Sequence, residues 1–195
     1  LYLYLAWHNT HTPLECPKEY YYPSLYNNSN SSRMTYNCMS RMLDDGMGNI
    51  TRSLKNNFLW NDTLIFFSAD NGGWNGNSGA NNYPLRGSKV SDFEGGIRVV
   101  SFLYGGINIL PSYVRGTTHT GLISIADWYS TLIHLVNGSD PTDHVNNLPN
   151  LDSINIWPSL MIPNATNSGR DEIFLSWSCG DPTNSLDPTK CNPNE

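Results

Sequence analysis

The chain has 195 residues, of which 38% are hydrophobic and 14% are charged, and its formal net charge is −6. These values describe a globular chain that is long enough for a real core, and they exclude an intrinsically disordered one. The negative charge argues against a general nucleic-acid binder, and no apolar run reaches the roughly 20 residues that a membrane span needs.

The first part of the chain predicts two strands that flank a long helix. Residues 1–7, LYLYLAW, predict a buried strand, and they lack the basic start and the cleavage site of a signal peptide. After a polar loop, apolar residues at spacings of three and four predict an amphipathic helix over residues 35–56, which Gly46 and Gly48 weaken. Residues 63–69, TLIFFSA, predict the second strand.

The second part continues the alternation of strands and helices. A loop rich in Gly and Asn covers residues 71–87, a third strand is expected at 97–104, and a helix at 126–136 ends before an Asn-Gly pair. Residues 173–177 predict a short last strand. This order predicts an α/β fold with a mainly parallel sheet, in which ligands gather at the carboxyl ends of the strands.

The second predicted strand runs into the sequence Asp-Asn-Gly-Gly at residues 70–73. Asp70 and Asn71 offer two hard oxygen ligands, which suit Ca²⁺ or Mg²⁺, and the glycines allow a sharp turn beside the ion. The same four residues are equally good turn chemistry without any metal. Taken alone, they do not decide between the two interpretations.

Three further side chains are candidates for chemistry. Arg86 and Lys89 lie in the loop PLRGSK, where they could hold an anion beside a metal, although isolated loop cations are more often simply solvated. His11 could act as a general acid or as a donor to an anion, and a lone histidine in a loop is more often structural. Glu94 and Arg98 could pair as a structural support.

Secretion is indicated by sequons and cysteines. Six asparagines lie in N-x-[ST] sequons, which argues for the secretory pathway and for a secreted or lysosomal glycoprotein: Asn27, Asn30, Asn49, Asn61, Asn137 and Asn164. The four cysteines suit an oxidising compartment and allow three full pairings. The short separation of Cys179 and Cys191 favours a bridge between these two.

Six stretches occur in one order from the N-terminus to about residue 175: LYLAWHNTHTPLECP, LIFFSADNGG, NNYPLRGSKVSDFEGGIRV, ISIADWYSTLIHL, LDSINIWPSL and RDEIFL. Together they resemble the sulfatase family, and within it the arylsulfatases of the N-acetylgalactosamine-4-sulfatase (arylsulfatase B) type. The resemblance implies the alkaline-phosphatase-like α/β sandwich with a mainly parallel sheet. It also implies a hydrolase that acts on a sulfated small molecule or glycan.

The resemblance assigns roles to four residues. It implies that Asp70 and Asn71 bind Ca²⁺ and that Lys89 contacts the sulfate. His11 then contacts the sulfate or the leaving-group oxygen. Zinc phosphatases of the same fold resemble this strand end but carry histidine where Asn71 stands, so the amide favours a sulfatase over a metal-dependent phosphoester hydrolase.

The formylglycine nucleophile of sulfatases is made from the motif C/S-x-P/A-x-R, which this segment lacks; the sequence Cys38-Met39-Ser40-Arg41 does not fit it. We therefore expect residues 1–195 to be part of a catalytic domain, without its nucleophile-bearing part and its small C-terminal domain. Such a segment needs the remainder of the same protein as its partner, and alone it should be unstable and inactive. The alternative is a non-catalytic sulfatase-like glycoprotein with a binding or structural role.

Overall fold

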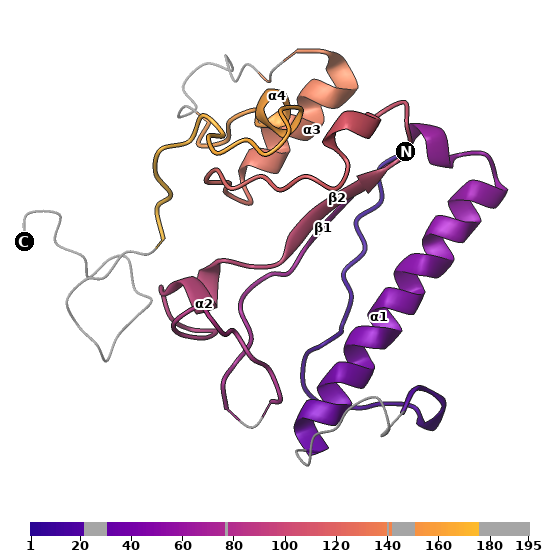
Figure 1. Ribbon diagram of the computed structural model, residues 1–195, viewed down its shortest axis with the longest axis vertical. Coiled ribbons are helices and arrows are strands. Elements are labelled where there is room, and N and C mark those ends of the chain that lie inside the picture. Colours follow the sequence, from indigo (N-terminus) through magenta and orange to yellow (C-terminus); the bar gives the residue numbers. More distant parts are fainter. Residues whose placement is uncertain (22–30, 77, 140, 142–150, 176–195) are drawn as a thin grey trace, which may run out of the picture. The chain divides into compact units, whose positions relative to one another are not determined.

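The computed structural model describes residues 1–21, 31–76, 78–139, 141 and 151–175. The chain divides into two compact units, Leu1–Pro111 and Ser112–Glu195, which we describe separately. The first unit contains the helices α1 and α2 and the strands β1 and β2, and the second contains α3 and α4 (Figure 1). Among the described helices, none combines the length and the apolar character that a membrane span requires.

Helix α1, Ser31–Asn56, confirms the helix predicted from the apolar spacing and begins four residues earlier than expected. Its two buried residues, Cys38 and Met39, lie on the face that the N-terminal part of the chain covers. Gly46 has a packing role in this helix: a Cβ atom there would lie 2.5 Å from the indole ring of Trp7. A glycine at this position therefore lets Trp7 approach the helix backbone.

Strand β1, Leu64–Ser68, confirms the second predicted strand in shortened form. Strand β2, Ser101–Gly105, confirms the third, but it begins four residues later than expected, since Ile97 lies in a short helix, and it extends to Gly105. They pair antiparallel, and the facing rings of Phe67 and Phe102 stack with 4.8 Å between their centroids. A parallel pair needs a crossover, usually a long helix, whereas the connection between β1 and β2 contains only the four-residue helix α2, Glu94–Ile97. The described strands therefore show an antiparallel pair where a parallel arrangement was expected.

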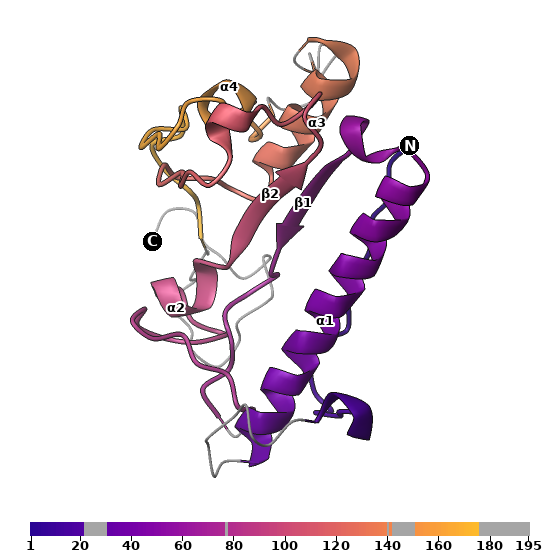
Figure 2. The ribbon, with the colours of Figure 1, turned by 45° about the vertical axis from the view of Figure 1, so that its right-hand side comes forward.

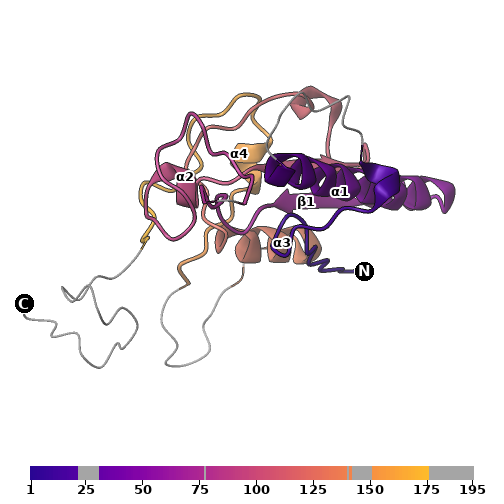
Figure 3. The ribbon, with the colours of Figure 1, turned by 90° about the horizontal axis from the view of Figure 1, so that it is seen from below.

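Residues 1–7 are the clearest correction to the sequence analysis. They form no strand, and Leu1, Tyr2, Leu3 and Tyr4 are each more than 70% exposed. The segment runs beside α1 instead (Figure 2 and Figure 3). An apolar run becomes a strand only where a neighbouring strand satisfies its backbone groups, and neither β1 nor β2 pairs with this segment. For the same reason residues 173–175 form no strand; residues 176 and 177 lie outside the described part.

The second unit is built around α3, Asp127–Asn137, which confirms the helix predicted there. The helix ends as its Asn-Gly pair predicts, because Gly138 adopts a left-handed conformation with φ of 72° and donates its backbone N–H to the His134 carbonyl. Ile156, just before the short helix α4, Trp157–Leu160, is fully buried. A 3₁₀ turn at Ser112–Val114 opens this unit, as similar turns at Lys18–Tyr20 and Trp60–Asp62 flank α1.

Candidate functional site

The strand-end turn, residues 69–73, directly continues the pairing of β1 with the segment that leads into β2. The backbone N–H of Ala69 donates to the Val100 carbonyl at 3.0 Å, and that of Gly72 donates to the Gly96 carbonyl at 2.8 Å. The two glycine-rich stretches that the sequence analysis singled out, DNGG and EGG, are thus hydrogen-bonded to each other.

Glycines allow these two stretches to touch backbone to backbone. A Cβ atom on Gly72 would lie 1.8 Å from the Gly95 carbonyl oxygen, and one on Gly95 would lie 2.4 Å from the Gly87 carbonyl oxygen. No side chain fits at such distances. The glycines therefore fix the path of the backbone on both sides of Asp70 and Asn71.

Asp70 and Asn71 each carry a side-chain oxygen in this turn. Asp70 is exposed, and its Oδ1 accepts the backbone N–H of Asn71 at 2.9 Å. The Asn71 amide is half-buried and donates its Nδ2 to the Gly72 carbonyl at 2.9 Å, which leaves Oδ1 as its acceptor atom. A carboxylate and an amide oxygen fit a hard cation such as Ca²⁺.

These two oxygens are only part of a metal site. A Ca²⁺ ion takes six to eight oxygen ligands. Among the described residues no group of three or more His, Cys, Asp or Glu side chains could hold a metal. The other ligands of such an ion must therefore come from backbone carbonyls, from water or from outside the described residues.

Lys89 lies beside the strand-end turn. Its backbone N–H donates to the Gly73 carbonyl at 3.2 Å. The side-chain amide of Asn82, in the loop that follows, also binds Gly73: it accepts the Gly73 N–H at 2.8 Å and donates to the Gly73 carbonyl at 2.7 Å. The half-buried Lys89 is therefore anchored through its own backbone next to Asn71.

The neighbouring cations have other partners. The guanidinium of Arg86 lies 4.1 Å from the centre of the Phe93 ring. The backbone carbonyl of Arg86 accepts the Gly95 N–H. Glu94 and Arg98 form the predicted pair at 3.1 Å, with both side chains more than half exposed. Such an exposed pair adds little stability, so we interpret it as a local support for the short helix α2.

His11 occupies a tight turn on the segment that lies against α1. Its backbone N–H donates to the His8 carbonyl at 2.9 Å, and its Nδ1 lies 2.8 Å from the Thr12 carbonyl oxygen. A carbonyl oxygen can only accept, so this hydrogen bond requires the proton on Nδ1. Nε2 of the exposed ring is then the nitrogen available to a ligand.

Helix α1 connects His11 with the strand-end turn. In the first turn of α1, Arg33 Nη1 donates to the Gly79 carbonyl at 2.6 Å, in the loop that follows Asn71. Further along the helix, the Met39 carbonyl accepts Asn9 Nδ2 at 2.8 Å, two residues before His11. Arg33 and Met39 are six residues apart, about 9 Å along a helix axis. The N-terminal part of α1 is thus hydrogen-bonded both to the loop after Asn71 and to the segment that contains His11.

The structure describes four of the six predicted glycosylation sites and two of the four cysteines. Four of the six sequon asparagines are exposed, Asn49, Asn61, Asn137 and Asn164, and Asn27 and Asn30 lie outside the described residues. Cys16 and Cys38 form a disulfide, a pairing that the sequence left open. Cys179 and Cys191 lie outside the described part, so the bridge favoured between them stays a prediction.

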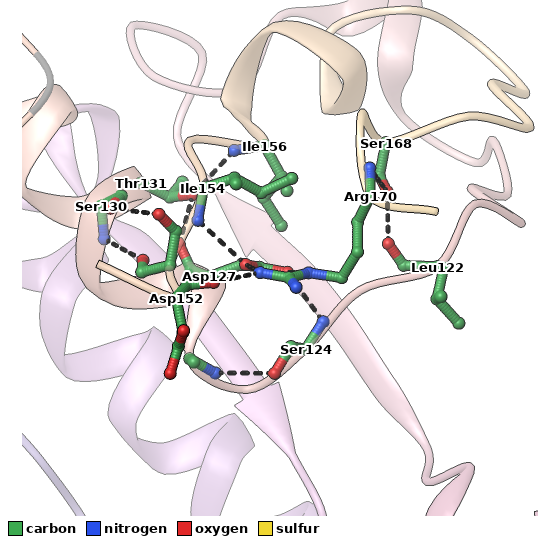
Figure 4. A network of polar contacts seen from close by, with 12 residues as sticks. Leu122, Ser124, Asp127, Ser130, Thr131, Asp152, Ile154, Ile156, Ser168 and Arg170 are labelled. Carbon is green, nitrogen blue, oxygen red and sulfur yellow. Dashed lines mark hydrogen bonds and ion pairs between the residues drawn. The ribbon is translucent and has the colours of Figure 1, made fainter. Parts of the chain in front are cut away.

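The second unit contains a polar network that the sequence analysis missed (Figure 4). The fully buried carboxylate of Asp127 accepts Arg170 Nε at 2.9 Å and a second bond from Arg170 Nη2. It also accepts the backbone N–H groups of Ser124 at 2.8 Å and Ile154 at 3.0 Å. Hydrogen bonding to Asp127 raises the pKa of Arg170. The one sequence signal was an acid in the first turn of an otherwise apolar helix.

Nearby side chains extend this network without opening it to solvent. The Thr131 hydroxyl donates to the Asp127 carbonyl at 2.8 Å and accepts the Ile156 N–H at 3.1 Å, and Thr131 is fully buried. Three of the stretches that carry the family resemblance, ISIADWY, LDSINIW and RDEIFL, meet here. Because the buried side chains Asp127 and Thr131 are hydrogen-bonded to other groups of the network, this network supports the fold rather than a reaction.

Two further features of the structure lie outside the strand-end turn. An open groove of about 850 Å³ between α1 and β2 is lined by charged and aromatic side chains; the sequon residue Asn49 lines it, but none of the predicted catalytic or metal-binding residues does. In the second unit both ring nitrogens of His119 are buried without a hydrogen-bond partner among the described residues. Burial lowers the pKa of His119, an effect partly opposed by the nearby backbone of Asn167 and Gly121.

Comparison with known proteins identifies the family. The model of the Sulfatase family matches residues 1–139. Arylsulfatase J of Mus musculus is 38% identical over 162 residues, which is 82% of this chain and 25% of the mouse protein. N-acetylgalactosamine-6-sulfatase of Mus musculus is 28% identical over 164 residues, 82% of this chain and 28% of that protein. The chain thus spans about a quarter of the length of these curated relatives.

Solved structures show the same fold. The crystal structure of Ps i-CgsB superposes with a TM-score of 0.73 at 34% identity and covers 87% of this chain and 35% of that one. A structure of the same protein in complex with k-i-k-neocarrahexaose gives a TM-score of 0.70. The fold is therefore the alkaline-phosphatase-like α/β fold that the sequence predicted, of which this chain contains one part. The chain belongs to the sulfatase family.

Proposed function

We propose that the protein containing this chain is a sulfatase of the secretory pathway, secreted or lysosomal, that hydrolyses sulfate esters of aryl compounds or glycans. The observation that carries the proposal is the shared backbone frame of Asn71 and Lys89, joined through Gly73. In the proposal this frame would bring two oxygen ligands and one cation together at the end of a strand. Exposed sequons and a disulfide support the compartment.

In this proposal Asp70 and Asn71 hold a Ca²⁺ ion, which would offset negative charge on the nonbridging sulfate oxygens. Lys89 binds the same sulfate by a charge-assisted hydrogen bond. His11 in its doubly protonated form donates the Nε2 proton to the oxygen of the leaving alcohol, while its Nδ1–H stays hydrogen-bonded to the Thr12 carbonyl. The formylglycine nucleophile would come from a part of the longer protein outside this chain.

The proposal treats residues 1–195 as part of the catalytic domain and treats the rest of that domain as their partner. Several apolar side chains of the first unit support this view because they are solvent-exposed, among them Tyr4 at 79%, Val100 at 70% and Phe102 at 43%. Apolar surface of this kind normally packs against other protein. We expect the isolated segment to be unstable and to show no turnover.

The central experiment replaces Lys89 by alanine in the full-length protein. Loss of a charge-assisted contact to a developing anion should lower kcat/KM for an aryl sulfate by about 10²–10³-fold. Arg86→Ala is the matched control, because Arg86 lies in the same loop but stacks on Phe93. Parental turnover in Lys89→Ala would contradict the sulfate-binding role. Absence of turnover in the parental protein, with retained binding of sulfated glycans, would favour the non-catalytic alternative.

A second experiment tests the metal independently of turnover. Addition of Ca²⁺ should raise the melting temperature of the parental full-length protein, because an ion that binds only the folded state stabilises it. Asp70→Ala should abolish this Ca²⁺-dependent shift, whereas Asp92→Ala, a change in an exposed acid of the following loop, should leave it unchanged. An unchanged shift in Asp70→Ala would show that Asp70 is not a ligand.

A further inference from the structure

We infer that the Cys16–Cys38 disulfide is a positioning device for His11, because it fastens the His11 segment, residues 7–16, to helix α1. This inference rests on the proposed catalytic role of His11. It assigns to the two cysteines a task in the reaction that goes beyond their contribution to stability.

The His11 segment is attached to α1 on both sides of His11. Before it, the ring of Trp7 packs against Gly46, and Asn9 Nδ2 donates to the Met39 carbonyl at 2.8 Å. After it, Cys16 is bonded to Cys38, with 6.1 Å between the two Cα atoms. His11 therefore lies on a short span whose two ends are held by one helix.

The helix offers a rigid base at this point. Cys38 is fully buried and Met39 is 3% exposed, which makes them the buried residues of α1. His11 itself is exposed, and its own hydrogen bonds go to His8 and Thr12 within the segment. The position of the imidazole relative to the rest of the molecule is thus set by the attachments of the segment and not by contacts of the ring.

The same helix connects these attachments to the strand-end turn, because Arg33 in its first turn donates to the Gly79 carbonyl. A general acid must be held close to the atom that it protonates, and a misplacement of about 1 Å can cost on the order of 10²-fold in rate. Without the disulfide, the residues that follow Asn9 are no longer attached to α1 through Cys16. His11 would then sample positions away from the leaving oxygen.

The test uses the full-length protein with both cysteines replaced, Cys16→Ser with Cys38→Ser, so that no free thiol is left. We expect kcat for an aryl sulfate to fall by about 10–100-fold, by the same positioning argument. KM should change by less than about threefold, because Lys89 and the metal ligands are untouched. The control is Tyr21→Phe, which removes only a weak 3.8 Å contact from Tyr21 to Met34 of α1; its kcat should equal the parental value.

A double-mutant cycle separates positioning from stability. In a His11→Asn background, removal of the disulfide should leave the residual kcat unchanged, since the residue that it positions is gone. An equal drop in kcat in both backgrounds, or a lower melting temperature with an unchanged kcat, overturns the positioning inference alone. Parental kcat in His11→Asn overturns the proposed role of His11, and the inference falls with it.

Asn9→Ala provides a second variant in case the protein without the disulfide does not fold. It removes the hydrogen bond to the Met39 carbonyl on the other side of His11. We expect a smaller loss of kcat, about 3–10-fold, that again disappears in the His11→Asn background. An unchanged kcat in Asn9→Ala would contradict the view that these attachments set the position of His11.

Discussion

The strand-end turn of the first unit and the Asp127 network of the second contain similar polar residues, but they use them in opposite ways. At the turn the hydrogen bonds run through the backbone of close-packed glycines, while Asp70 is exposed and Asn71 is half-buried. In the network the side chains of Asp127 and Thr131 are themselves hydrogen-bonded and buried. Polar groups that are left open point to ligand binding, whereas saturated ones point to folding.

Asp127→Ala should give the largest loss of stability. It leaves the Arg170 guanidinium, only 16% exposed, without its buried partner, which typically costs about 3–5 kcal/mol. Denaturant unfolding of the full-length protein measures this loss. Asp152→Ala is the matched control, because its backbone carbonyl accepts from Arg170 and its carboxylate acts on Arg170 only through its charge; we expect a smaller loss than for Asp127→Ala. Equal stability of the two variants would contradict the structural role of Asp127.

Gly72→Ala should have the next largest effect, because its Cβ would collide with the Gly95 carbonyl. We expect a loss of about 1–3 kcal/mol, as in other overpacked sites, together with loss of the Ca²⁺-dependent rise in melting temperature. Gly48→Ala is the control, since nothing lies within 4 Å of a Cβ there and the residue is exposed on α1. That change should stabilise the protein by up to about 1 kcal/mol.

The smallest expected effect concerns His119, because burial lowers the pKa of its ring below the ordinary histidine value of about 6.5. The folded state then binds this proton less readily than the unfolded state. Stability is therefore fully present above about pH 6.5 and declines as the pH falls below that value. His119→Gln should remove this part of the pH dependence in thermal unfolding. The difference between parental protein and variant should be flat above pH 7; a difference that grows with rising pH would have the wrong sign.

The sequence predicted the features that depend on local patterns. Helices α1 and α3 and strand β1 follow from the spacing of apolar residues and from the Asn-Gly stop. Residues 1–7 have the pattern of a strand as well, but a strand also needs a partner, which a pattern cannot supply. The antiparallel direction of β2 depends on the long connection between the strands, which the apolar pattern does not describe.

The candidate site shows the same limit. Asp70 and Asn71 became candidates from their residue types, and the family resemblance added the role of Lys89; the structure joins the backbone of Lys89 to Gly73 of the turn. Their glycine frame, the Cys16–Cys38 pairing and the Asp127–Arg170 pair join residues far apart in the chain. Composition and spacing carry no information about such contacts, because each depends on how the chain has already folded.

The backbone contact between Gly72 and Gly95 has a practical consequence for protein engineering. The DNGG turn is shaped by the helical turn Glu94–Ile97 as much as by its own four residues. A designer who transplants the DNGG turn into another scaffold must also transplant the turn Glu94–Ile97 and keep the backbone distance between Gly72 and Gly95. The portable unit is this pair of turns.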